Sequence, residues 1–184
     1  DRQFVEITPN SPSLLNAMDS SYTFVAWAKP ASLPQATHPY ANGSAIICRE
    51  GQNSLMSYYK QGYFSFYSYN LSLVQSNNIY GINEWHFVAG VADDSEKKLK
   101  VFVDDTETNS VSYSGSLLSY TNQYRIGTCR DSSTWAHWFN GTIDEVRISN
   151  IARDPSEFNN YYCGDVDNSG SAPNRTDIIY LSNI

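Results

Sequence analysis

The chain has 184 residues, of which 41% are hydrophobic and 14% aromatic, enough for one domain with a sizeable core and a small appendage. Its formal net charge of −7 disfavours nucleic-acid binding, because contacts to phosphates need clustered Lys and Arg. No run of about 18 apolar residues could span a bilayer, so membrane insertion is not expected.

Alternation of apolar and polar residues predicts strands along most of the chain. The first strand is expected over residues 3–7, and the strongest pattern, YTFVAWA, lies over residues 22–28. Further strands are predicted over residues 44–48, 55–60, 63–69, 85–92, 100–103 and 124–128. Turns are expected between them at Gln61-Gly62 and at Asp104-Asp105. The spacing of these strands is typical of a sandwich or barrel.

The last strand is predicted over residues 139–150, FNGTIDEVRISN. Ile143 and Val146 are three positions apart, so the alternation slips by one residue at Asp144-Glu145. One interpretation is a β-bulge, which would change the direction of the side chains at this point.

A short helix is predicted directly after this strand, with Asp154 as its N-cap and Pro155 at its first position. The composition then changes near Cys163, because residues 163–174 are rich in Gly, Asp, Asn and Ser. Residues 176–184, TDIIYLSNI, carry an apolar stripe that predicts a second helix. We therefore expect a main domain over residues 1–162 and a separate module over residues 163–184.

The chain has three cysteines, Cys48, Cys129 and Cys163, so at least one is unpaired or paired elsewhere. Cys48 and Cys129 each precede an Arg at the end of an apolar run. A bridge between neighbouring strands and a pair of buried free thiols are both compatible with this pattern.

Four stretches together carry a family resemblance. They are SYTFVAWAKP near the start, NEWHFVAGVADDSEKKLKVFVDD at 83–105, YRIGT at 124–128 and FNGTIDEVRISNIARDPSEFNNYY at 139–162. In combination they resemble the laminin-G-like, concanavalin A-like jelly-roll domains over about residues 3–162. The resemblance implies an all-β fold, an antiparallel two-sheet β-sandwich, with a short C-terminal loop-helix appendage. The strands predicted from alternation agree with this architecture.

The tail, GDVDNSG followed by NRTDIIYLSNI, resembles one calcium-loop repeat of a dockerin. The loop of this family uses oxygen ligands and a Gly for its sharp turn. Asp177 lies one residue beyond the place of the family's last carboxylate, and the chain carries one such repeat where a dockerin usually carries two. The resemblance implies a calcium cofactor held by Asp165, Asp167, Ser169, Ser171 and Asp177, in a loop one residue longer than usual. The alternatives are a weaker site that Thr176 closes, and a chance loop rich in Asp, Asn and Gly that binds no metal.

An enzymatic role is not expected. Glycan hydrolases of the jelly-roll family carry two carboxylates on one strand face, typically as Glu-x-Asp-x-x-Glu, and this run does not occur here. Asp144 and Glu145 are adjacent, so they would point to opposite faces of a regular strand, whereas a paired acid and base must share one cleft. His86 follows Trp85 at a strand start and is interpreted as structural.

The candidate ligand site is the stretch DSSTWAHW over residues 131–138, within a loop predicted over residues 130–138; it contains Asp131, Trp135, His137 and Trp138. Exposed aromatic faces with a few polar groups suit a sugar; alternatively, the two Trp fold back onto the rim of the core. Pentraxin-like relatives place an Asn and an Asp at similar points of the fold for calcium, and this resemblance implies that Gln52-Asn53 lies near Asp131.

Two further candidates remain at the sequence level. Resemblance to glucanase relatives implies a structural calcium at Asp144. A second candidate surface is the tyrosine cluster on the sheet, for which ordinary sheet packing is the alternative: Tyr58, Tyr59, Tyr63, Tyr67 and Tyr69.

From these residues and resemblances we expect a non-catalytic extracellular recognition module. It would bind glycans, be associated with calcium, and form part of a larger secreted or cell-surface protein. The alternative is a structural or adhesion subunit whose sandwich contacts a surface protein or further copies of itself.

Overall fold

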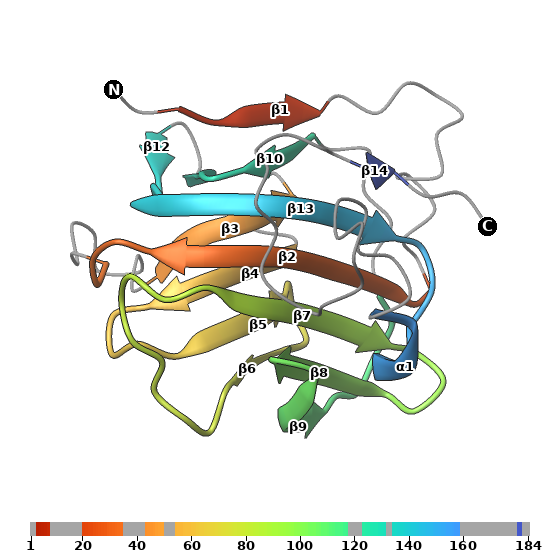
Figure 1. Cartoon of the computed structure of the whole chain (residues 1–184). Coiled ribbons are helices and arrows are strands. Elements are labelled where there is room, and N and C mark those ends of the chain that lie inside the picture. Colours follow the sequence, from red (N-terminus) through yellow and green to blue (C-terminus); the bar gives the residue numbers. More distant parts are fainter. Residues whose placement is uncertain are drawn as a thin grey trace.

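The computed structural model describes residues 3–7, 20–34, 43–49, 54–117, 123–131, 134–158 and 180–181. These residues form two six-stranded sheets that face each other, and a separate two-stranded ribbon (Figure 1). The predicted two-sheet β-sandwich is therefore confirmed. No helix within the described ranges has the length and apolar character needed to cross a membrane.

The first sheet has the strand order β1-β10-β3-β4-β5-β6, and every pair in it is antiparallel. Its strands are β1 (Val5–Ile7), β3 (Gly43–Arg49), β4 (Ser54–Tyr59), β5 (Phe64–Ser68), β6 (Ser72–Gln75) and β10 (Tyr124–Ile126). The predicted hairpin turn joins β4 to β5, and Gly62 adopts a φ of 89° there.

The second sheet has the order β14-β13-β2-β7-β8-β9. Its strands are β2 (Tyr22–Pro30), β7 (His86–Asp93), β8 (Lys98–Val103), β9 (Thr106–Ser112), β13 (Gly141–Ser149) and β14 (Tyr180–Leu181). The turn between β8 and β9 is made by Asp104 and Asp105, both with positive φ, as tight two-residue hairpins require.

Three strands in these sheets, β6, β9 and β14, were not predicted as strands. β6 and β9 are edge strands, and β9, with the sequence TETNSVS, is mostly polar. An edge strand buries little surface, so its sequence carries a weak apolar alternation. The edges meet at Asn109, whose side-chain amide donates a 2.8 Å hydrogen bond to the carbonyl of Gln75.

The main core lies between the sheets and is rich in aromatic rings. The ring of Phe24 in β2 meets that of Phe66 in β5, with centroids 5.9 Å apart, and that of Tyr124 in β10, 6.1 Å apart. These three side chains come from both sheets, and each is completely buried. Edge-to-face contacts of this kind stabilise the pair beyond the area they bury.

A second apolar cluster lies on the outer face of the second sheet. Val25, Trp27 and Phe87 pack there with Phe158 at the end of α1 (Pro155–Phe158). The predicted start of α1 is confirmed: the carboxylate of Asp154 accepts a hydrogen bond from the Ser156 amide, and that of Glu157 accepts one from the Asp154 amide. This arrangement is similar to a capping box, except that the side chain of Asp154 accepts from the second helical residue and not the third.

The predicted irregularity in the last strand is also present. The register of β13 against β2 shifts between Asp144 and Arg147, and Glu145 adopts a φ of 47°. A bulge therefore interrupts the alternation where the sequence indicated it.

The predicted C-terminal module lies mostly outside the described residues. Tyr180 and Leu181 are described, and they form a short parallel strand beside Arg147 and Ile148 of β13. The prediction of a helix over residues 176–184 is therefore wrong at these two positions. The apolar residues there have a spacing typical of a helix, but Tyr180 and Leu181 pair with the edge of a sheet.

Candidate functional site

The predicted ligand loop is a β-ribbon over much of its length. β11 (Cys129–Asp131) pairs with β12 (Thr134–Ala136), so that Arg130 lies opposite Trp135. The expectation of an irregular loop over residues 130–138 was wrong there, because a ribbon of three residues per strand is too short to give an alternation signal.

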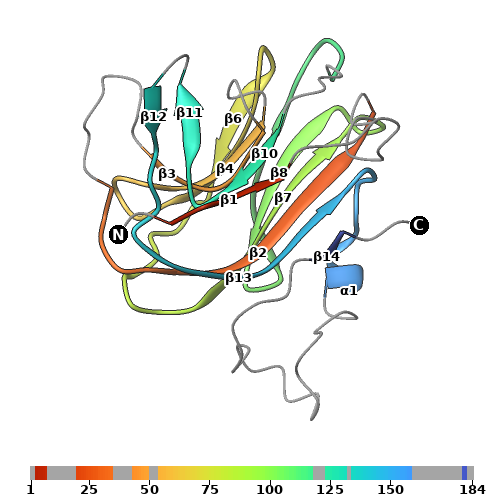
Figure 2. The ribbon, with the colours of Figure 1, turned by 90° about the horizontal axis from the view of Figure 1, so that it is seen from above.

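A disulfide fixes the base of the ribbon. Cys129 at the start of β11 is bonded to Cys48 of β3, with Cα atoms 5.5 Å apart. Both cysteines are completely buried in a small cluster with Ala45 and Leu55, separate from the main core. Of the two alternatives for these cysteines, the bridge is the one present. The ribbon consequently lies on the side of the first sheet that faces away from the second (Figure 2).

His137 and Trp138 return the chain from the ribbon to the sandwich. His137 is 7% exposed, and its Nδ1 lies 3.0 Å from the carbonyl oxygen of Gly43. Trp138 is partly buried, and its ring meets Phe4 edge-on at 5.8 Å. Contacts of this kind agree with the alternative in which the second Trp folds back onto the sandwich.

The other predicted site residues are only partly described. The backbones of Asp131 and Trp135 lie in the ribbon, but their side chains are outside the described part of the structure, as is all of Asn53. The predicted calcium ligands of the tail, Asp165, Asp167, Ser169, Ser171 and Asp177, are outside it as well.

Asp144 lies in the bulge of β13 and is 8% exposed. Its Oδ1 accepts a 2.8 Å hydrogen bond from the amide of Glu145. Among the described residues, no group of three or more His, Cys, Asp or Glu side chains is placed to hold a metal. A calcium at Asp144 would therefore need further oxygen ligands of other kinds.

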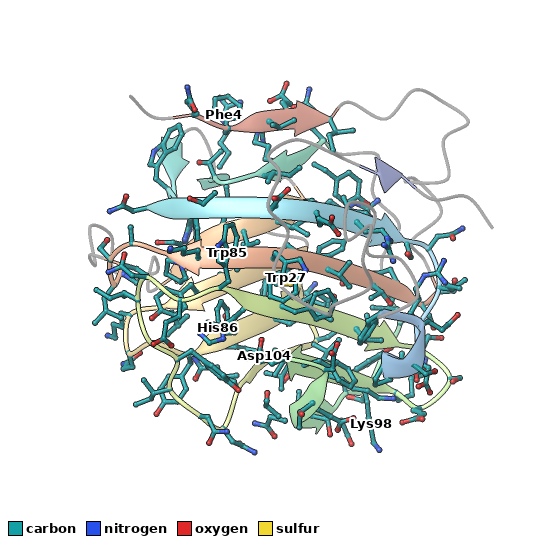
Figure 3. All side chains as sticks on the ribbon, viewed as in Figure 1. Phe4, Trp27, Trp85, His86, Lys98 and Asp104 are labelled. Atoms are coloured by element: carbon teal, nitrogen blue, oxygen red, sulfur yellow. A yellow bond between two sulfur atoms is a disulfide. The ribbon has the colours of Figure 1, made fainter. Side chains whose placement is uncertain are left out.

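His86 has a structural environment, as expected. Its Nδ1 lies 2.9 Å from Oδ2 of Asp104, whose Oδ1 accepts a hydrogen bond from the Phe87 amide (Figure 3). The imidazole packs against the rings of Phe64 and Tyr80, with centroids 5.7 and 5.0 Å away. The pair joins the start of β7 to the β8–β9 turn.

The outer face of the first sheet is a more extensive candidate surface. Met56, Phe66 and Val74 point into the core, so their neighbours in β4, β5 and β6 point outwards. The strand register arranges the outward residues of β3 to β6 in rows. One row is Cys48, Leu55, Tyr67 and Leu73; the next is Ala45, Ser57, Ser65 and Gln75; the third holds Gly43 and Tyr59.

We call these rows the tyrosine–serine face. The serine side chains of its middle row project little from the sheet: the hydroxyls of Ser57 and Ser65 form a 2.7 Å hydrogen bond with each other, and both residues are buried. Tyr67 on one side and Tyr59 on the other are partly exposed, and Leu73 is 41% exposed. An added Cβ at Gly43 would lie 3.1 Å from the Tyr59 ring, so this ring rests on the glycine.

The tyrosine cluster named from the sequence therefore divides between two faces. Tyr58 points inwards and is completely buried, and its hydroxyl donates a 2.7 Å hydrogen bond to the carbonyl of Tyr80. Burial raises the pKa of this phenol above its usual value. Tyr59 and Tyr67 point outwards, because each follows an inward-pointing residue, Tyr58 in β4 and Phe66 in β5.

The profile of the family described as the concanavalin A-like lectin/glucanases superfamily matches residues 3–159. No curated protein matches the chain by sequence.

Several solved structures are similar in fold. A Bacteroides ovatus protein described as a candidate carbohydrate-binding protein is 16% identical with a TM-score of 0.66; the match covers 84% of this chain and 43% of that one. The CBM40 domain of the Ruminococcus gnavus IT-sialidase, bound to α2,3-sialyllactose, is 15% identical with a TM-score of 0.63, covering 85% and 94%. A mutant of the NanB sialidase of Streptococcus pneumoniae is 13% identical with a TM-score of 0.61, covering 86% and 26%.

Proposed function

The chain belongs to the concanavalin A-like lectin/glucanases superfamily, and from this premise we propose that it is a non-catalytic module that binds glycans through its tyrosine–serine face. We further propose that the module belongs to a larger secreted or cell-surface protein. Such a protein would use the sandwich to attach itself to a carbohydrate surface.

The observation that carries this proposal is the arrangement of Tyr59 and Tyr67 on either side of the low serine row. Sugar rings present apolar faces to aromatic side chains and hydroxyls to polar groups, so a binding surface combines the two kinds of residue. Here the rings are partly exposed, and the amide of Gln75 lies at the end of the serine row. The ribbon anchored at Cys129 borders the same face.

Two similar structures support the proposal as analogies. One is described as a candidate carbohydrate-binding protein, and the other was solved with a bound sialyllactose. At this level of identity they share the fold, and the glycan-binding role of this chain rests on its own face.

The non-catalytic part of the proposal is supported by the surroundings of the two adjacent acids. Asp144 is buried and hydrogen-bonded to the backbone of its neighbour, within the bulge of β13. A glycosidase needs two carboxyl groups that flank the scissile bond about 5–10 Å apart in an open cleft. Incubation with laminarin and related polymers, followed by a reducing-sugar assay, tests this; measurable turnover would contradict it.

A glycan array with the purified chain tests the binding proposal. We expect binding that weakens about tenfold or more in Tyr67→Ala and in Tyr59→Ala, because each change removes a stacking surface. Ile151→Ala is the control, since Ile151 is 38% exposed and follows β13 in the other sheet. Equal binding by all variants would place the site elsewhere.

Gly43→Ala provides a second, more selective variant. The added methyl group would press on the Tyr59 ring and on Ser57 without removing either side chain. Reduced glycan binding with little loss of thermal stability would link the position of Tyr59 to recognition. If no glycan binds and the protein assembles with itself in sedimentation experiments, the alternative of a structural or adhesion subunit is favoured instead.

A further inference from the structure

The absence of charged side chains at the described outward positions of the tyrosine–serine face indicates the chemical class of its ligand. Rows of Leu, Ser, Tyr, Ala and Gln cover the outward positions of β3 to β6, and none of these described side chains carries a charge. We propose that this face binds an uncharged oligosaccharide, laid along β4 over several sugar rings. The inference rests on the proposed glycan-binding function and specifies its ligand.

The length of the ligand follows from the strand geometry. Tyr67 lies opposite Leu55, four residues before Tyr59 in β4. At about 3.4 Å per residue, the two tyrosines are about 14 Å apart along the strand, with the serine row between them. This separation exceeds the width of one hexose ring. A monosaccharide can therefore contact one tyrosine, whereas a chain of several units contacts both.

The neutrality of the ligand follows from where the described cations lie. Arg125 of β10 shares a row with Cys48, but it is 2% exposed and its Nη2 lies 2.9 Å from the carboxylate of Glu6. Three strand spacings, about 14 Å, separate β10 from Tyr67 in β5. Among the described cations, Arg125 is thus not available to a sugar carboxylate over the tyrosines, and a carboxylate desolvated there without a cation would be unfavourable.

Two other cations border the face and define the alternative. Lys60 follows Tyr59 in the hairpin turn, and Arg130 follows Cys129 in the ribbon. If the ligand were acidic, one of these side chains would have to pair with it. Variants Lys60→Gln and Arg130→Gln therefore distinguish the two ligand classes.

The experiment compares matched neutral and acidic probes by calorimetry and on an array. The acidic probes are sialyllactose and uronic-acid oligosaccharides; the neutral ones are lactose and gluco-, xylo- and manno-oligosaccharides of increasing length. We expect binding among the neutral probes, with affinity rising at least about tenfold from the monosaccharide to the chain that reaches both tyrosines. Lys60→Gln and Arg130→Gln should retain that affinity, and Tyr59→Ala should abolish the gain with length.

Salt dependence gives an independent readout. Because the outward rows of β3 to β6 carry no charged side chain among the described residues and the proposed ligand is neutral, raising NaCl from about 50 to about 500 mM should change the dissociation constant by less than about twofold. Binding restricted to acidic probes, lost in Arg130→Gln or Lys60→Gln and weakened by salt, would overturn the inference while leaving glycan binding intact. Absence of binding to every probe would overturn both the inference and the proposed function.

Discussion

Gly90 shows at the scale of one residue how closely the two sheets approach. It lies in the middle of β7, paired with Phe24 of β2, and the ring of Phe66 from the other sheet occupies the space that a Cβ would need. The aromatic layer of the core therefore depends on the missing side chain at this position. Interiors are close-packed, so an added methyl group here has to displace a buried ring.

We predict that Gly90→Ala lowers the free energy of unfolding by about 1–3 kcal/mol, because it overpacks the core against Phe66. Chemical denaturation followed by tyrosine and tryptophan fluorescence measures the change. The matched control is Gly81→Ala, where the atoms nearest to the new Cβ would belong to the exposed carboxyl group of Glu84, 3.3 Å or more away. A variant at Gly90 as stable as this control would show that Phe66 repacks freely.

At the scale of the element, the β7–β8 turn is organised by one carboxylate. Asp93 ends β7 and is 8% exposed, and its Oδ1 accepts hydrogen bonds from the amides of Ser95 and Glu96 and from the Ser95 hydroxyl. Its Oδ2 lies 3.1 Å from Nζ of Lys100. Burial raises the pKa of this carboxyl, but the hydrogen bonds and Lys100 outweigh it, so the pKa lies below its usual value.

The pH dependence of stability follows from the direction of this shift. A carboxyl whose pKa is lower in the folded state contributes stability above its unfolded pKa of about 3.9, and loses it as the pH falls through the folded value. We predict that Asp93→Asn costs about 1–3 kcal/mol at neutral pH and that the difference from the parent shrinks below about pH 4. Urea unfolding at several pH values measures this. Glu107→Gln, an exposed change in β9, is the control, and a pH-independent difference would contradict the prediction.

The ribbon is a second element, and the disulfide between Cys48 and Cys129 joins it to β3. The disulfide joins residues 81 apart in sequence, so removing it enlarges the unfolded ensemble. We predict that replacing both Cys48 and Cys129 by Ser lowers the free energy of unfolding by about 2–4 kcal/mol. Differential scanning calorimetry should show a lower melting temperature for the variant, and a shift in the same direction for parent protein that was reduced while unfolded and then refolded. A double variant as stable as the parent would contradict the prediction.

At the scale of the whole molecule, the first and the last described strands, β1 and β14, are both edge strands, and they lie on the same side of the sandwich. β1 is the edge of the first sheet beside β10, and β14 is the edge of the second sheet beside β13 (Figure 1). β14 follows directly after the sequence that predicts a calcium loop. Any cation held by that loop would therefore be coupled to the sandwich through the pairing of Arg147 with Tyr180.

We predict that the full chain binds calcium and that its melting temperature rises with the ion, since a ligand of the native state stabilises it. Calorimetric titration should lose the calcium heat in Asp165→Ala, with Asp131→Ala as the comparison for a site near the ribbon. Retention of the heat in both variants would remove both assignments. A chain that gives no heat at all, before and after treatment with EDTA, would contradict calcium binding altogether.

The sequence by itself determined much of the fold, because side-chain alternation is a local property with a period of two. It located β2, β7, β8 and β13, the irregularity at Asp144-Glu145 and the capping residue Asp154. It also named Tyr59 and Tyr67 among the tyrosines of one surface, although it grouped them with the buried Tyr58. These features depend on neighbours within a few residues.

Only the tertiary structure decided which strands lie side by side and which outward residues share a face. β10 pairs with both β1 and β3, Cys48 meets Cys129, and the serines of β4 and β5 form a floor between two tyrosines. None of these neighbours is close in the chain. This pairing is favoured because it buries the apolar faces of both sheets at once. The total apolar surface buried depends on the whole chain, so no local sequence pattern determines it.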